Sequence, residues 1–399
     1  MHSFDFWTAG ILLFAACLVA MLSARLRLPY AVGLVVAGIG LALLPGGVRW
    51  TLTPELIFFV LLPPLVFEAA IQIHWHPFRR ELPLLLALVT IGVALGAAVV
   101  AAGMHWLAGW SWLGAAFFGV LIAATDPVSV IAAFKATKVQ ERLHLLVEAE
   151  SLLNDGVAAV GFAVLVALAS GGATDAPHIA LDFLVTAFGG AATGAIVALP
   201  LILVAGRTGD RLVELSLTML IAYGAFLIAE HFHLSGVLAT LTAGMIVGNY
   251  ALPRWFTADG RDSTITHWEF VAFLANSIIF LLIGSHEVGL PWLGLVEAVG
   301  LAILLAVAGR AATVYPIALA FARTRLALPW GYKHVLFWGG LRGALALALA
   351  LALPVSVAER DAIVTVTFGV VAFSIFVQGL TMPWLVARLG LLLGQGTAE

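Results

Sequence analysis

Residues 147–158 read VEAESLLNDGVA and place carboxyl, hydroxyl and amide groups in an otherwise apolar part of the chain. The polar members are Glu148, Glu150, Ser151, Asn154 and Asp155. On a helix, the last four of these lie at positions i, i+1, i+4 and i+5 and share one face. Their oxygen atoms suit a hard cation or a proton, and the absence of His and Cys beside them argues against zinc or copper. The stretch therefore predicts one wall of an ion site.

The composition indicates that this wall lies inside a membrane. Hydrophobic residues make up 62% of the 399 residues and charged residues only 10%, with a mean hydropathy of +1.09. Soluble domains carry about 25% charged residues, so a large soluble core is excluded. The single cysteine, Cys17, excludes an intrachain disulfide framework and a cysteine metal cluster. The net charge of −3 indicates no class of partner.

Apolar runs long enough to cross a bilayer, about 20 residues each, recur along the whole chain. The connections are short, so we expect no inserted soluble domain. The first run lacks a basic start and a clear cleavage site, which favours a retained span over a signal peptide. We predict an all-α integral membrane protein, one transporter domain over residues 1–399, with about thirteen transmembrane helices. The predicted spans are 6–24, 29–46, 53–72, 82–106, 111–134, 142–170, 179–205, 212–231, 233–250, 266–287, 292–321, 331–353 and 361–388.

The basic residues predict the orientation, because cytoplasmic loops carry an excess of Lys and Arg. Loops after even-numbered spans hold only Arg49 and Arg360. We therefore expect the N-terminus outside and the C-terminus in the cytoplasm. The basic residues after odd-numbered spans are Arg25, Arg27, Arg79, Arg80, Lys135, Lys138, Arg142, Arg207, Arg211, Arg254, Arg261, Arg323, Arg325, Lys333 and Arg388.

Four charged side chains fall near the middle of predicted spans, where each costs at least ~2.5–3.5 kcal/mol. Asp155 lies roughly 20 Å into the sixth span, taking about 1.5 Å per residue. Asp126 lies at a similar depth in the fifth span, entered from the opposite side, and Glu68 and Arg342 lie deep in the third and twelfth. Their common level indicates a polar site inside the helix bundle rather than four unrelated buried residues.

Two of these spans carry signals for a broken helix. Pro127 disfavours helical geometry at Asp126, and glycines surround Arg342 in the segment GGLRG. Freed backbone groups at this depth are tolerated only where protein or a cavity receives them. We predict two inverted six-helix repeats, about 6–170 and about 212–388, joined by a linker helix over 179–205. Their broken helices would cross at mid-membrane, where transporters of this design bind their ions.

Several motifs resemble the sodium/proton antiporters of the monovalent cation:proton antiporter family 1, related to sodium/hydrogen exchangers. The resemblance covers nearly the whole chain and preserves the order of the motifs. It is carried by LPYAVGLVVAG (28–38), LPPLVFEAA (62–70), ATDPV (124–128), ESLLNDG (150–156) and GGLRGA (339–344).

The resemblance implies a role for each site residue. Asp155 would carry Na⁺ (or Li⁺) and the proton in turn, and Asp126 would line the same site. Asn154, in an Asn-Asp pair, would go with electroneutral exchange, and Glu150 would form a structural ion pair with Arg342. Members of the family are homodimers. The implied Na⁺ ligands are Asp155, Asp126, Ser151, Thr125 and Glu68, with Thr125 acting through its backbone oxygen.

The residues alone support exchange through one site. A carboxylate removed from bulk water holds a proton more readily, so a proton and a cation can compete for it. No ATP-binding GxxxxGK[ST] motif occurs, and no other cofactor is expected, so an ion gradient must drive transport. The short loops favour the plasma membrane of a prokaryote.

Three alternatives to Na⁺/H⁺ exchange remain at this point. A K⁺/H⁺ antiporter would have the same architecture, because pocket size is not visible in the sequence. A cation channel could use the same oxygens, although no repeated ring of identical residues is present. An aspartyl protease could use Asp126 and Asp155, although the GxGD context is missing. Arg310, in the eleventh span, either pairs with a neighbouring acid or stabilises a helix end.

Overall fold

The computed structural model describes residues 6–26, 29–44, 52–128, 130–131, 134, 139–171, 176–290 and 292–391, and these residues form helices and connecting segments without a β-sheet. Eight helical segments are long and apolar enough to cross a membrane, and shorter apolar helices accompany them. The predicted all-α membrane architecture is confirmed, whereas the count of thirteen spans stays a prediction. Four of the basic residues used for the orientation, Arg27, Arg49, Lys135 and Lys138, lie outside the described residues.

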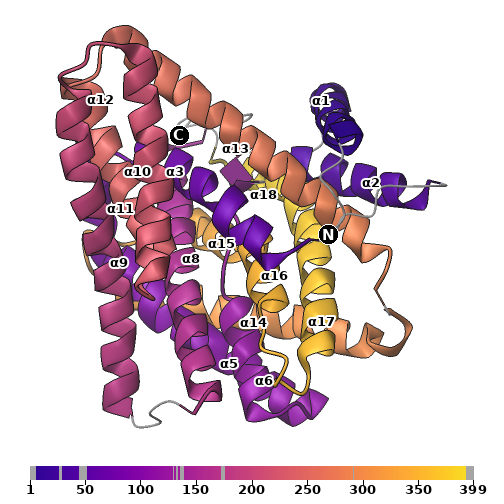
Figure 1. Ribbon diagram of the computed structural model, residues 1–399. Coiled ribbons are helices and arrows are strands. Elements are labelled where there is room, and N and C mark those ends of the chain that lie inside the picture. Colours follow the sequence, from indigo (N-terminus) through magenta and orange to yellow (C-terminus); the bar gives the residue numbers. More distant parts are fainter. Residues whose placement is uncertain are drawn as a thin grey trace.

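The helices follow the predicted apolar runs closely (Figure 1). In the first half, up to the long helix α9, they are α1 (Phe6–Leu26), α2 (Tyr30–Leu43), η1 (Leu56–Leu61), α3 (Leu62–Gln72), α4 (Trp75–Ala87), η2 (Leu88–Gly92), α5 (Val93–Ala108), α6 (Trp112–Leu121), α8 (Glu141–Ala169) and α9 (Ala176–Ala205). In the second half they are α10 (Arg211–His231), α11 (Gly236–Ile246), η3 (Val247–Ala251), α12 (Leu252–Arg254), α13 (Ala258–Glu287), η4 (Trp292–Gly294), α14 (Val296–Ala320), α15 (Trp330–Trp338), α16 (Ala344–Leu351), α17 (Arg360–Phe373), η5 (Ser374–Gly379) and α18 (Leu380–Arg388).

Both predicted helix breaks are present. Helix α6 ends at Leu121, and the chain is non-helical from Ala124 to Pro127, because proline removes a backbone donor and disfavours the helical conformation before it. Helix α15 ends at Trp338, and the glycine-rich segment 340–343 is non-helical before α16 begins. The two breaks touch, since the backbone N–H of Asp126 donates to the carbonyl of Leu341 at 2.8 Å.

Two apolar clusters surround these breaks. The larger joins α1 to α6, α8 and the helices from α13 to α18, with a few residues of α10 and α11. The smaller joins α3 with α9, α10, α11, α12 and α13, around the fully buried Trp268 and Phe67. Helix α13 contributes to both and crosses the molecule beside α3, with α9, α10 and α11 gathered to one side (Figure 1). The inverted-repeat relation between the two halves stays a prediction.

Candidate cation site

A cavity of about 470 Å³ lies between α3, α8, α13 and the two helix breaks. It extends from the crossing, at Asp126 and Gly343, to Gln72 at the end of α3 and to the exposed side chain of Glu269 on α13. Its polar lining comes from five elements far apart in the sequence. The lining residues that can bind a cation or a proton are Glu68, Asp126, His144, Glu148, Asp155 and Glu269.

Asp155 and Asp126 both face this cavity, as the sequence predicts. Asp155 projects from the middle of α8, and its buried Oδ1 atom has no hydrogen-bond partner within the described structure. Asp126 lies in the first break, and its Oδ1 accepts a hydrogen bond from the N–H of Val128 at 2.9 Å. A buried carboxylate oxygen without a donor needs a cation, a proton or water to compensate its desolvation. Asp155 is therefore the side chain best placed to exchange ligands.

Glycine at position 343 permits the close crossing of the two breaks. A Cβ atom built on Gly343 would lie 2.1 Å from Oδ2 of Asp126. Real Cβ atoms do not approach an oxygen so closely, so Asp126 or the second break would have to move. The two breaks can therefore pack this closely only because residue 343 has no side chain.

We expect Gly343→Ala to reduce transport strongly by displacing Asp126 from the cavity wall. The measurement is cation-driven proton movement in liposomes, with the thermal midpoint of the purified variant recorded beside it. Gly40→Ala is the matched control, because no atom lies within 4 Å of the Cβ position there. Normal transport by Gly343→Ala would show that the crossing tolerates displacement.

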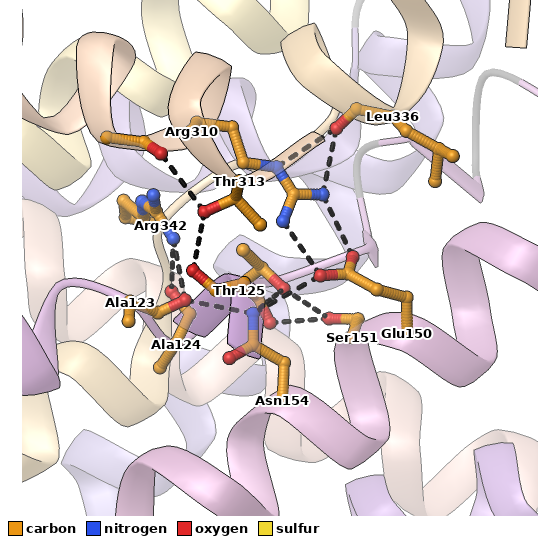
Figure 2. A network of polar contacts seen from close by, with 12 residues as sticks. Ala123, Ala124, Thr125, Glu150, Ser151, Asn154, Arg310, Thr313, Leu336 and Arg342 are labelled. Atoms are coloured by element: carbon orange, nitrogen blue, oxygen red, sulfur yellow. Dashed lines mark hydrogen bonds and ion pairs between the residues drawn. The ribbon is translucent and has the colours of Figure 1, made fainter. Parts of the chain in front are cut away.

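Thr125, Ser151 and Asn154 meet in one hydrogen-bonded cluster (Figure 2). The Ser151 hydroxyl donates to the carbonyl of Thr125 at 2.5 Å and also lies 3.2 Å from the Thr125 Oγ1 atom. The Asn154 Nδ2 atom donates to the carbonyl of Ala123 at 2.9 Å and to Thr125 Oγ1 at 3.2 Å. Of these three, only Thr125 also lines the cavity. Ser151 and Asn154 therefore fix the backbone of the first break from the side away from the cavity.

Glu68 lies on the opposite wall, on α3. Its Oε1 atom accepts a hydrogen bond from the Gln72 amide one turn further along the helix. The described residues contain no group of three or more His, Cys, Asp or Glu side chains placed to hold one metal ion. A cation at Asp155 and Asp126 would thus need oxygen ligands from Thr125 or from water in addition.

The predicted ion pair between Glu150 and Arg342 is wrong, because Arg310 occupies that place (Figure 2). Arg310 of α14 donates from Nη1 and Nη2 to the two carboxylate oxygens of Glu150, at 2.7 and 2.9 Å. Its Nε and Nη2 atoms also donate to the carbonyl of Leu336 at the end of α15. Glu150 and Arg310 are only 3% and 6% exposed. An unpaired charge at that depth would be strongly destabilising, so each side chain neutralises the charge of the other. Of the two roles that the sequence left open for Arg310, the structure shows both, pairing with an acid and bonding near a helix end.

Arg342 has a different set of partners from the one that the sequence suggested. Its Nη1 atom donates to the carbonyls of Ala123 and Ala124, at 2.7 and 3.2 Å (Figure 2). These carbonyls follow the C-terminal end of α6, where the helix dipole is negative and the last carbonyls lack helical partners. Arg342, which lies in the second break, thus provides hydrogen-bond donors for the free carbonyls of the first break. Neither Arg310 nor Arg342 lines the cavity, and both stabilise the crossing of the two breaks.

Three of the six cavity residues that can bind a cation or a proton were not assigned to the site from the sequence, namely His144, Glu148 and Glu269. Glu148 and His144 precede Asp155 by seven and eleven residues, which places all three on one face of α8. That spacing was available as a signal. Glu269 could not be found this way, because only the packing of α13 against α3 brings it to the cavity.

Comparisons with known proteins place most of this chain in one family of transmembrane exchangers. A family model described as "Sodium/hydrogen exchanger, transmembrane" matches residues 11–388. The chain is 38% identical over 371 residues to the Na(+)/H(+) antiporter ApNhaP of Aphanothece halophytica, covering 92% of this chain and 70% of that protein. It is 31% identical over 414 residues to the Na(+)/H(+) antiporter NhaH of Halobacillus dabanensis, covering 98% of this chain and all of that protein.

A solved structure has the same fold. The sodium proton antiporter MjNhaP1 from Methanocaldococcus jannaschii, determined at pH 8, superimposes with a TM-score of 0.74 at 21% sequence identity. The match covers 97% of this chain and 98% of that one.

Proposed function

Since the chain belongs to the transmembrane sodium/hydrogen exchanger family, we propose that it exchanges Na⁺ for H⁺ across a membrane through one site at Asp155. The observation that carries the proposal is the buried, unpartnered carboxylate oxygen of Asp155 facing a cavity at the crossing of two broken helices. The relatives named as Na⁺/H⁺ antiporters support Na⁺ as the cation, and the K⁺/H⁺ alternative is not favoured. Those relatives are transporters, so the protease alternative gains no support.

Exchange follows from competition at Asp155. A proton neutralises the carboxylate directly, whereas Na⁺ needs several oxygen ligands at once. In the proposed site these come from Asp155, Asp126 and Thr125, with Glu68 joining through water. Because either ligand compensates the same negative charge, the site holds one or the other. Moving the loaded site between the two sides of the membrane then couples the two gradients.

Ser151 and Asn154 take a supporting part in this proposal. Their hydrogen bonds hold the backbone around Thr125 in the non-helical form of the first break. The sequence-based expectation made Ser151 a Na⁺ ligand and linked Asn154 to electroneutral exchange, but the contacts of both residues favour a role in positioning the first break. We retain electroneutral exchange as part of the proposal, because the family resemblance links it to Asn154 in the Asn-Asp pair.

The environment of the protein is also proposed from the sequence. The basic loops support an N-terminus outside and a cytoplasmic C-terminus. In this orientation the cavity between α3, α8 and α13 would open to the cytoplasm. The family resemblance supports a homodimer in a prokaryotic plasma membrane. Asymmetric labelling of cysteines added to the two ends of the chain would test the orientation.

The test of the function uses purified protein in liposomes with an imposed pH gradient and a pH dye inside. Na⁺, Li⁺ and K⁺ are added in turn, and each measurement is repeated at a clamped membrane potential. We expect proton movement on adding Na⁺ or Li⁺ that does not depend on voltage. A response to K⁺ alone would contradict the choice of cation. Cation flux without proton movement would indicate a channel instead.

A further inference from the structure

Four residues of α8 form a row along the cavity wall. They are His144, Glu148, Leu152 and Asp155, and all four line the cavity. Their spacing of four, four and three residues keeps them on one face of the helix. Glu148 precedes Asp155 by seven residues, roughly 10 Å along the helix axis at about 1.5 Å per residue. It therefore lies between Asp155 and the end of α8 where the helix begins.

Glu148 is built into the wall rather than exposed on a surface. Only 8% of the residue is exposed, and its Oε2 atom lies 3.5 Å from Nδ1 of His144. Burying a carboxylate at this depth in a membrane protein is costly and marks a functional residue by default. The mechanism proposed above uses Asp155 and leaves Glu148 without a part.

The charge around Glu148 favours cations. The other charged groups that face the cavity are Glu68 of α3, Glu269 of α13, Asp126 of the first break and Asp155 itself. None of the described residues that line the cavity is Lys or Arg. A cleft lined by one sign of charge with low-dielectric walls raises the local concentration of the opposite ion. Glu148 is the buried acid that a cation meets before Asp155 along α8.

We propose that Glu148 captures Na⁺ from the open end of the cavity and delivers it to Asp155. The inference rests on the proposed function and adds a residue to the same transport path.

The test compares Glu148→Gln, Glu148→Asp and wild-type protein in liposomes, as proton movement against Na⁺ concentration at pH 8. We expect Glu148→Gln to raise the apparent KM for Na⁺ roughly five-fold or more, with little change in maximal rate. The effect shrinks when choline chloride raises the ionic strength. Glu148→Asp restores most of the affinity. Asp361→Asn, at a side chain that is 99% exposed and away from the cavity, is the charge-matched control and keeps the wild-type KM.

A wild-type KM in Glu148→Gln, or a loss of maximal rate at unchanged KM, overturns capture by Glu148. Failure of the wild type to move protons with Na⁺ would instead overturn the proposed function, so the two failures are distinguishable.

Discussion

Asp155→Asn is expected to reduce Na⁺-driven proton movement to the level of empty liposomes while the protein still folds. The amide has the shape of the carboxyl group but carries no charge and binds no proton in the physiological range, so neither ligand can be held in turn. Oδ1 of Asp155 has no hydrogen-bond partner in the described structure, so the exchange of oxygen for nitrogen breaks no existing contact at that atom. Liposome transport and size-exclusion chromatography of the purified variant are the two measurements.

The control for this experiment is Asp361→Asn, which removes a carboxylate of the same type from an exposed position at the start of α17. It should transport at the wild-type rate. A folded Asp155→Asn variant with normal exchange would remove Asp155 from the mechanism. Exchange would then have to proceed through Asp126, the other aspartate on the cavity wall.

Arg310→Met is expected to cause the largest loss of stability, about 3–5 kcal/mol in the free energy of unfolding. The reason is that Glu150, which is 3% exposed, would keep its charge without its bidentate partner. The carbonyl of Leu336 would lose two donors at the same time. The measurement is the denaturation midpoint of purified protein in detergent, together with the yield of folded protein.

Two further variants separate this pair from its surroundings. The double variant Glu150→Gln with Arg310→Met should recover much of the lost stability, because no uncompensated charge remains buried. Arg342→Met should cost less, about 1–3 kcal/mol, since it leaves carbonyl oxygens rather than a carboxylate without donors. If Arg342→Met were the more destabilising of the two, the assignment of Arg310 as the partner of Glu150 would be wrong.

The choice of arginine that pairs with Glu150 could not be predicted from the sequence. Arg310 and Arg342 are both single arginines in apolar spans, and each could have reached Glu150. Their spacing along the chain carries no information on which one does, because the answer depends on how α14 packs relative to α8. The structure places Arg310 beside Glu150 and turns Arg342 toward the end of α6.

The sequence by itself determined the class of the protein, the course of its apolar helices and both helix breaks. These features follow from local causes, namely the length of apolar runs, the missing N–H of Pro127 and the glycines beside Arg342. It also placed Asp126 and Asp155 on a common site, because buried charges in a membrane must find one another or a ligand.

Only the tertiary structure decided which polar groups line the cavity and which support it from behind. Ser151 and Asn154 share a helical face with Asp155, yet they bond to the backbone of the first break, whereas Glu148 and Glu269 reach the cavity. The physical reason is that a helical face is wide enough to contact two different neighbours. Which neighbour each side chain meets is set by the packing of helices far apart in the sequence, and no local pattern encodes that packing.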